Sequence, residues 1–164
     1  MHVKNNDKEQ IMKNEIKYVH TNLIANDWKK LAQFYIDAFE CEPTYPERDL
    51  TGDWIDKMTR IPDVRIKGMH LKLPGYDTGP TLETFNYNKA SNSKKSSVIN
   101  NYGFGHIAFH VTNVEEIFEK IIAHGGSKYG DLIVKEIHGM GILKAIYAMD
   151  PEGNIIEIQN WSKK

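Results

Sequence analysis

One arrangement of residues occurs twice along this chain. His20 lies in the segment Tyr-Val-His-Thr-Asn-Leu and precedes Glu83 by 63 residues, while His106 lies in Phe-Gly-His-Ile-Ala-Phe and precedes Glu157 by 51 residues. In both halves the order is a strand with the His, a polar helix cap, an amphipathic helix, further strands and a strand with the Glu. Such a repeat indicates two copies of one supersecondary unit. Two His and two Glu form a candidate divalent-metal site.

The first unit is predicted over residues 15–88. Polar and apolar residues alternate around His20, as in a half-buried strand, and Asn26 and Asp27 supply helix N-cap chemistry. Apolar residues then recur at helical spacing through Phe39. The expected elements are a strand within 15–25, a helix from 26 to 39, and strands near 64–73 and 80–87.

A segment at 51–62 has no counterpart in the second half. Trp54, Ile55 and Met58 fall at helical spacing within it, which predicts a short inserted helix. This helix is either a lid over a site or a helix packed on the open sheet. Residues 1–14 are polar and aperiodic and are expected to form a flexible arm, and the Ser-, Asn- and Lys-rich residues 89–102 are expected to link the two units.

The second unit is predicted over residues 103–164. Asn113 and Glu116 have the spacing of a capping box, and an apolar helical stripe follows and ends before Gly125 and Gly126. The expected elements are a strand near 104–111, a helix from 114 to 122, and strands near 132–137, 143–149 and 154–161.

These patterns predict an α+β fold made of two βαβββ modules. Each module forms a curved mixed sheet with a helix on one face, and strand parity puts His20, Glu83, His106 and Glu157 on the opposite face. Placing ionisable groups in such a concavity is costly unless they are paired or bind a cation. A metal-binding cup between the curved sheets is therefore expected.

Composition excludes several classes of partner. The net charge is −1 and the lysines are scattered, so neither nucleic acid nor an anionic membrane is expected to bind. Cys41 is the only cysteine, and no signal-like or spanning apolar stretch is present. A cytoplasmic protein that binds a small molecule is the resulting expectation.

The chain resembles the vicinal oxygen chelate superfamily, and within it bacterial glyoxalase I (lactoylglutathione lyase). The resemblance rests on Val-His-Thr-Asn-Leu at 19–23, Thr-Leu-Glu-Thr-Phe-Asn-Tyr at 81–87, Gly-His-Ile-Ala-Phe at 105–109 and Asp-Pro-Glu-Gly-Asn-Ile-Ile-Glu at 150–157. It implies that His20, Glu83, His106 and Glu157 bind one metal ion, with water completing the shell. It also implies a homodimer or an intrachain pairing of modules around the cup, and glutathione or another thiol as co-substrate.

The ligand types suit Ni²⁺, Co²⁺ or Zn²⁺. A divalent cation stabilises the enediolate that forms when a proton leaves the carbon next to a carbonyl, and a carboxylate serves as the base. Glu157 is the first candidate for this catalytic base and Glu83 the second. The predicted activity is thus a glyoxalase I type lyase or isomerase acting on an α-hydroxycarbonyl compound or thiohemiacetal. The alternatives are a non-catalytic binding protein of the resistance type, a methylmalonyl-CoA epimerase-like enzyme, and a dioxygenase.

Four other His residues and five aromatic residues also have predicted positions. His110 shares the face of His106 and is expected to be a pocket wall or to support a ligand, whereas His70, His124 and His138 are expected at the surface. Five aromatic residues are expected either to line a substrate pocket or to be ordinary core: Tyr18, Phe85, Tyr87, Phe104 and Trp161.

Overall fold

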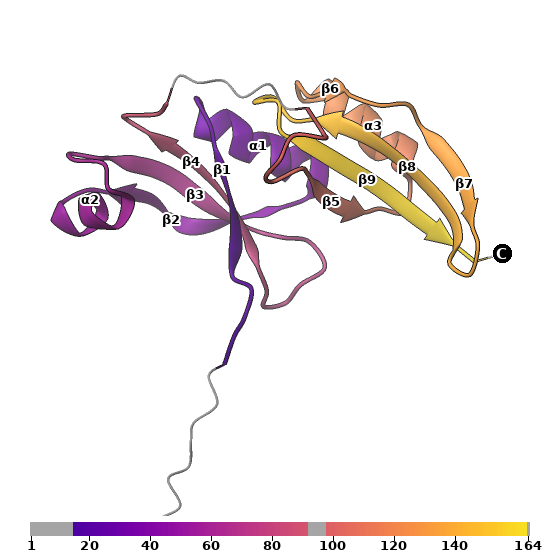
Figure 1. The fold of residues 1–164 in the computed structure, drawn as a ribbon, viewed down its shortest axis with the longest axis horizontal. Helices are drawn as coiled ribbons and strands as arrows, with labels where there is room; N and C mark the ends of the chain where they lie inside the picture. The colour runs from indigo at the N-terminus through magenta and orange to yellow at the C-terminus, as the bar shows by residue number, and fades with distance from the viewer. Residues whose placement is uncertain (1–14, 92–97, 164) are drawn as a thin grey trace, which may run out of the picture.

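The computed structural model describes residues 15–91 and 98–163, and in this part of the chain two mixed β-sheets lie side by side (Figure 1). The predicted N-terminal arm and residues 92–97 of the predicted linker lie outside the described residues. The first sheet has the order β1-β4-β3-β2, and the second has β5-β9-β8, with β6 and β7 both paired to β8. The strands are β1 (His20–Ile24), β2 (Glu42–Leu50), β3 (Ile66–Lys72), β4 (Thr81–Tyr87), β5 (Ile107–His110), β6 (Ser127–Lys128), β7 (Ile133–Ile137), β8 (Gly141–Met149) and β9 (Ile155–Ser162).

The predicted α+β class with curved mixed sheets is confirmed. In each sheet one parallel pair, β1 with β4 or β5 with β9, joins an otherwise antiparallel arrangement. A parallel pair requires a crossover connection, and helices α1 (Trp28–Phe39) and α3 (Val114–Ala123) lie within the two crossovers.

Both long helices begin at the predicted caps. The Asp27 side chain accepts a hydrogen bond from the Lys30 backbone N–H at 3.1 Å, and the Asn113 side chain accepts one from the Glu116 N–H at 3.2 Å. These bonds satisfy amides at the helix start that have no partner within the helix.

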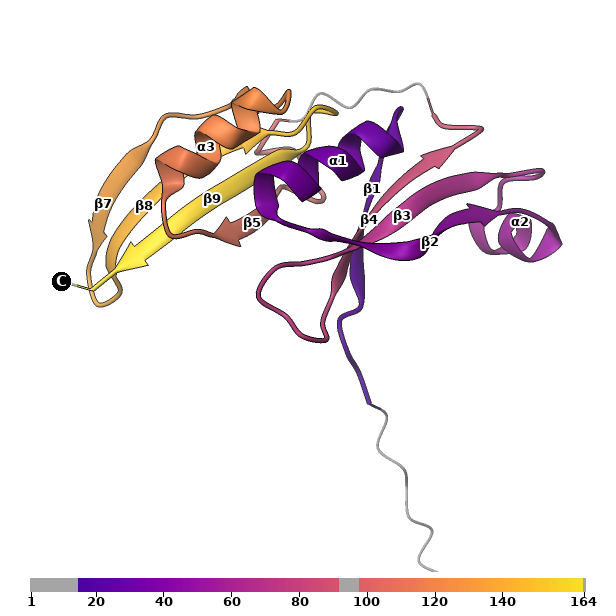
Figure 2. The same cartoon turned by 180° about the vertical axis from the view of Figure 1, so that it is seen from behind.

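Helices α1 and α3 lie on one side of the two sheets, opposite the faces that carry Glu83 and Glu157, as the view from behind shows for the helices (Figure 2). A single apolar core extends from the first sheet through α1 and α3 to the second. Phe39 on α1 stacks on Phe109 of β5 with ring centroids 4.2 Å apart, which joins the two halves directly.

The turn between β8 and β9 is bonded to the first half of the chain. Asp150, which is 3% exposed, accepts a hydrogen bond from the Tyr35 hydroxyl of α1 at 3.0 Å. Glu152 accepts bonds from the backbone N–H groups of Asn26 and Asp27 at 2.9 and 3.1 Å. Burial raises the pKa of both Asp150 and Tyr35. The turn therefore satisfies polar groups at the start of α1 and within it, and fixes one half against the other.

The positions of some strands differ from the sequence predictions. The βαβββ pattern requires three strands after the first helix, but residues were assigned to only two of them; the remaining strand is β2, an edge strand, where its Pro43 and Pro46 are tolerated. His20 is the first residue of β1, and His106 directly precedes β5, so neither lies in the middle of a strand as predicted. The helix expected within 51–62 is α2 (Asp53–Thr59), and its buried Ile55 packs with Val64, Ile66 and Phe85. No helix in the described ranges is both long and apolar enough to cross a membrane.

We predict that Asp150→Ala lowers the free energy of unfolding by about 2 to 4 kcal/mol, because it leaves the buried Tyr35 hydroxyl and several turn amides without an acceptor. Urea unfolding measures this loss. The matched control is Asp131→Ala, which removes an exposed carboxylate paired with Lys128 and should leave stability nearly unchanged, because solvent screens such a pair. Equal losses in the two variants would contradict a structural role for the Asp150 contacts.

Candidate functional site

Glu83 is the centre of a polar cluster on the open face of the first sheet. Strand register places it between Asn22 of β1 and His70 of β3. Its Oε1 lies 3.3 Å from His20 Nδ1 and 3.0 Å from His70 Nε2, and its Oε2 accepts a hydrogen bond from Asn22 Nδ2 at 2.7 Å. The Glu83 side chain is only 7% exposed. It is therefore a nearly buried carboxylate held by three side chains.

The prediction that His70 lies at the surface without functional partners is wrong. Its side chain is 24% exposed, contacts Glu83, and lies edge-on to His20 with ring centroids 6.2 Å apart. Burial is the main cause that lowers the pKa of His70, opposed by the negative charge of Glu83. If β3 and β4 pair as a hairpin, residue 70 lies opposite residue 83. This pairing is the signal that would have placed His70 beside Glu83.

A second cluster occupies the open face of the second sheet. His106 Nε2 lies 3.1 Å from Glu157 Oε2, and the His106 ring lies edge-on to Tyr147 with centroids 5.2 Å apart. Tyr147 pairs with Glu157 in register, as His70 pairs with Glu83 in the first sheet. Burial and the adjacent Glu157 raise the pKa of the Tyr147 hydroxyl. No local sequence pattern marks Tyr147, since its place beside Glu157 depends on strand register.

The two clusters differ in how firmly the carboxylate is held. The neighbour of Glu83 on β1 is Asn22, which donates a hydrogen bond, whereas the neighbour of Glu157 on β5 is Ala108, which has no donor side chain. Glu157 is also more exposed, at 17% against 7%. Glu157 is therefore held by fewer side chains than Glu83.

The two His–Glu pairs lie on different sheets, which share no hydrogen-bonded strands. Within residues 15–91 and 98–163, no three or more His, Cys, Asp or Glu side chains form a group arranged to hold a metal ion. The donor types, an imidazole and a carboxylate in each pair, are nevertheless those that Ni²⁺, Co²⁺ and Zn²⁺ accept. Each pair fits half of such a coordination shell.

A cavity of about 390 Å³ adjoins the first pair. The open face of the first sheet forms its floor, and the inserted helix α2 contributes part of its wall. Besides His20, Glu83 and His70, it is lined by Asn22, Arg48, Leu50, Trp54, Ile55, Met58, Thr59, Ile66, Phe85 and Tyr87. Phe85 and Tyr87 thus line a pocket, one of the two roles expected for the aromatic residues. Tyr18 and Phe104 are exposed, and Trp161 donates a hydrogen bond to Gln159.

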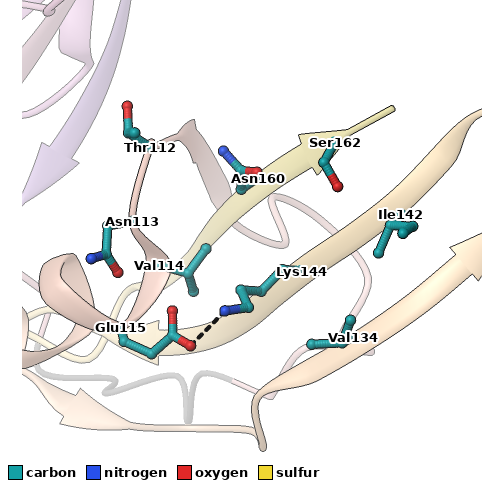
Figure 3. Close-up of a pocket in the computed structure, with 9 residues that line it drawn as sticks. All are labelled: Thr112, Asn113, Val114, Glu115, Val134, Ile142, Lys144, Asn160 and Ser162. Carbon is teal, nitrogen blue, oxygen red and sulfur yellow. Dashed lines mark hydrogen bonds and ion pairs between the residues drawn. The ribbon is translucent and has the colours of Figure 1, made fainter. Parts of the chain in front are cut away.

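A larger hollow lies beside the N-terminus of α3, away from both pairs. It has a volume of about 730 Å³, and its only charged lining residues, Glu115 and Lys144, form an ion pair at 2.6 Å (Figure 3). That pairing lowers the pKa of Glu115. The hollow lacks both unpaired charge and a His side chain, so it offers no evident chemistry. His110 lines a separate hollow with Phe39 and Lys120, which does not include His106.

A family model identifies the superfamily of this chain, and solved structures share its fold. The family model for the Glyoxalase/Bleomycin resistance protein/Dioxygenase superfamily matches residues 17–158. A glyoxalase family protein from Bacillus cereus has a TM-score of 0.75 at 12% identity, over 92% of this chain and 97% of that chain. A glyoxalase family protein from Enterococcus faecalis has a TM-score of 0.53 at 21% identity, over 88% of this chain and 96% of that chain. The fosfomycin resistance protein FosX from Listeria monocytogenes has a TM-score of 0.52 at 17% identity, over 93% of this chain and 95% of that chain. These structural likenesses show the fold alone. No curated protein sequence matches this chain.

We predict that Asn22 and Glu83 are energetically coupled in a double-mutant cycle of Asn22→Ala, Glu83→Ala and the double variant. Removing Asn22 takes the donor from a nearly buried carboxylate oxygen, which costs about 1 to 3 kcal/mol, and this loss should disappear once Glu83 is gone. Urea unfolding of all four proteins gives the coupling energy. Additive losses would mean that the contact does not hold Glu83 in place.

Proposed function

This chain belongs to the Glyoxalase/Bleomycin resistance protein/Dioxygenase superfamily, and on that premise we propose that it is a metal-dependent lyase or isomerase of the glyoxalase I type. The proposed reaction moves a proton from the hydroxyl-bearing carbon of a small α-hydroxycarbonyl compound or thiohemiacetal to the neighbouring carbonyl carbon, so that the hydroxyl and the carbonyl exchange places. The observation that supports it best is the pair of His–Glu clusters, each on the open face of its own sheet.

His20, Glu83, His106 and Glu157 would hold one divalent ion, Ni²⁺, Co²⁺ or Zn²⁺. When bound, such a cation acts as a Lewis acid that stabilises negative charge building on the carbonyl oxygen of the substrate. Two imidazoles and two carboxylates give the nitrogen and oxygen donor set that suits these ions. Their combined charge of −2 also neutralises the cation.

We propose that two protomers complete each site. In one chain the packing of α1 against the second half keeps the two pairs on separate sheets with their faces open. A second copy can supply the missing pair, so that His20 and Glu83 of one protomer face His106 and Glu157 of its partner. A homodimer built in this way contains two equivalent sites, each enclosed between two open sheet faces.

Glu157 is the proposed general base. It lacks a donor on β5, it is more exposed than Glu83, and Tyr147 lies beside it to donate a hydrogen bond. It is thus free to take a proton from the substrate carbon and return it to the neighbouring carbon. Glu83, held by Asn22, His20 and His70, serves to bind and position. A thiol, glutathione or another, would enter as part of the substrate adduct.

We predict that a mixture of two inactive variants recovers activity. His20→Ala and His106→Ala each damage both sites of a homodimer, so each alone should bind little divalent metal and should not convert the hemithioacetal of methylglyoxal and a thiol. In a heterodimer of the two, one site has both defects and the other has none. Co-expression with two different tags and purification through both isolates this heterodimer.

The heterodimer should bind about half as much metal as the wild-type dimer and show about half its turnover. Sites contained within single chains would give no recovery, because every chain would still carry one defect. Full metal binding without turnover of any hemithioacetal in the wild-type protein would instead indicate a binding protein.

We also predict that Glu157→Gln lowers kcat by roughly 10²- to 10⁴-fold, because the amide cannot accept the transferred proton. The fold should persist, since Gln can keep a hydrogen bond with Tyr147. Thermal unfolding and turnover of the hemithioacetal measure the two effects. Glu119→Gln, on the exposed side of α3, is the control with the same change in charge and should leave both unchanged. Unchanged kcat in Glu157→Gln would remove Glu157 from catalysis.

A further inference from the structure

We propose that the cavity beside the first His–Glu pair binds a substrate that carries one carboxylate next to an apolar group, with Arg48 as the anion-binding residue. This inference rests on the proposed function, because the carboxylate would belong to the molecule that reacts at Glu83 and His20. It names the substrate class more closely than the family does. It also assigns a role to the inserted helix α2.

The floor of the cavity depends on Gly68, which has no side chain. Arg48 on β2, Gly68 on β3 and Phe85 on β4 lie opposite one another in register. A Cβ on Gly68 would lie 2.0 Å from Phe85 Cδ1, so the phenyl ring extends over the glycine. The His70 ring meets the Phe85 ring edge-on, with centroids 5.7 Å apart. An aromatic surface therefore connects the polar cluster at Glu83 with Arg48.

The wall of the cavity is apolar and unusually exposed. Trp54 and Met58 on α2 are 56% and 75% exposed although both line the cavity. Ile55, on the same helix, is buried against Ile66 and Phe85 and holds α2 in position. A ligand with an apolar group would remove the Trp54 and Met58 side chains from water, which is favourable.

Arg48 supplies the only permanent positive charge among the residues that line the cavity. Within the described part of the chain it forms no ion pair, and its Nη1 donates to the backbone oxygen of Pro46. The neighbouring Asp49 is already paired with Arg65, at 2.6 Å between Oδ2 and Nη2. The Arg48 guanidinium thus keeps N–H donors for a carboxylate, which such a group binds with two parallel hydrogen bonds.

The positions of Arg48 and Glu83 fit a small bridging molecule. Glu83 lies on β4 opposite His70 of β3, and Arg48 lies on β2 opposite Gly68 of β3. Arg48 is therefore two strands across the sheet from Glu83 and two residues along the strand direction. Strand spacing and rise separate their Cα atoms by roughly 12 Å, a distance that both side chains shorten. A ligand whose carbonyl lies near Glu83 can therefore place its carboxylate at Arg48 and its apolar group over Phe85.

The test compares two probes of the same shape, 3-phenylpropionate with a carboxylate and 3-phenylpropionamide with a neutral amide, by calorimetric titration of the full chain without added metal. The wild-type protein should bind the acid at least about tenfold more tightly than the amide, as expected for a charge-assisted bidentate contact. Arg48→Met should bring the two affinities within about twofold by weakening only the acid. Its unchanged affinity for the amide shows that the variant is folded. Lys57→Met, an equal loss of charge on the exposed side of α2, should keep the preference for the acid.

Equal binding of the two probes by the wild-type protein, or an equal loss of acid binding in the Lys57 and Arg48 variants, would overturn the inference. The outcome is independent of the metal. If the protein takes up metal but does not prefer the acid, the Arg48 subsite is refuted and the proposed function stands. If the protein prefers the acid through Arg48 but takes up no divalent metal, the carboxylate site stands and the proposed function is refuted.

Discussion

The attachment of the β8–β9 turn to helix α1 is the constraint on which the arrangement of the molecule depends. Asp150 is buried against the Tyr35 hydroxyl, and Glu152 accepts hydrogen bonds from the start of the helix. The buried Asp150 and Tyr35 are costly unless their polar atoms are hydrogen-bonded, so the turn tolerates few other positions. Together with the stacking of Phe39 on Phe109, it fixes the two sheets side by side with their helices on one side. The two open faces are then available to a second copy.

The two sheets place their site residues at equivalent positions but carry different side chains at some of them. In both sheets a carboxylate on the last strand pairs in register with a residue of the preceding strand, His70 in one and Tyr147 in the other. The strand on the other side carries Asn22 beside Glu83 and Ala108 beside Glu157. One carboxylate is therefore fixed and the other is less restrained. This difference suits a site in which one carboxylate binds and the other moves a proton.

The inserted helix makes the first sheet different from the second. The turn between β7 and β8 is short, whereas the connection between β2 and β3 contains α2, which packs through Ile55 onto the open face. This packing encloses a cavity next to Glu83 and brings Trp54 and Met58 to its wall. With two carboxylates neutralising a divalent cation, Arg48 would remain as the uncompensated charge. The proposed preference for a carboxylate follows from that balance.

The sequence by itself determined the local structure and the repeat. Alternation predicted the strand at His20, and the turn residues between apolar segments predicted strands near β3, β4, β8 and β9. The side chains of Asp27 and Asn113 predicted the helix starts, and strand parity put the four candidate ligands on the faces opposite helices α1 and α3. These features depend on neighbours in the chain. The roles of His70 and Tyr147, the hollow over Gly68 and the separation of the two pairs were decided by the tertiary structure. They depend on which strands pair, in which register, and on how the two halves pack, which local patterns do not specify.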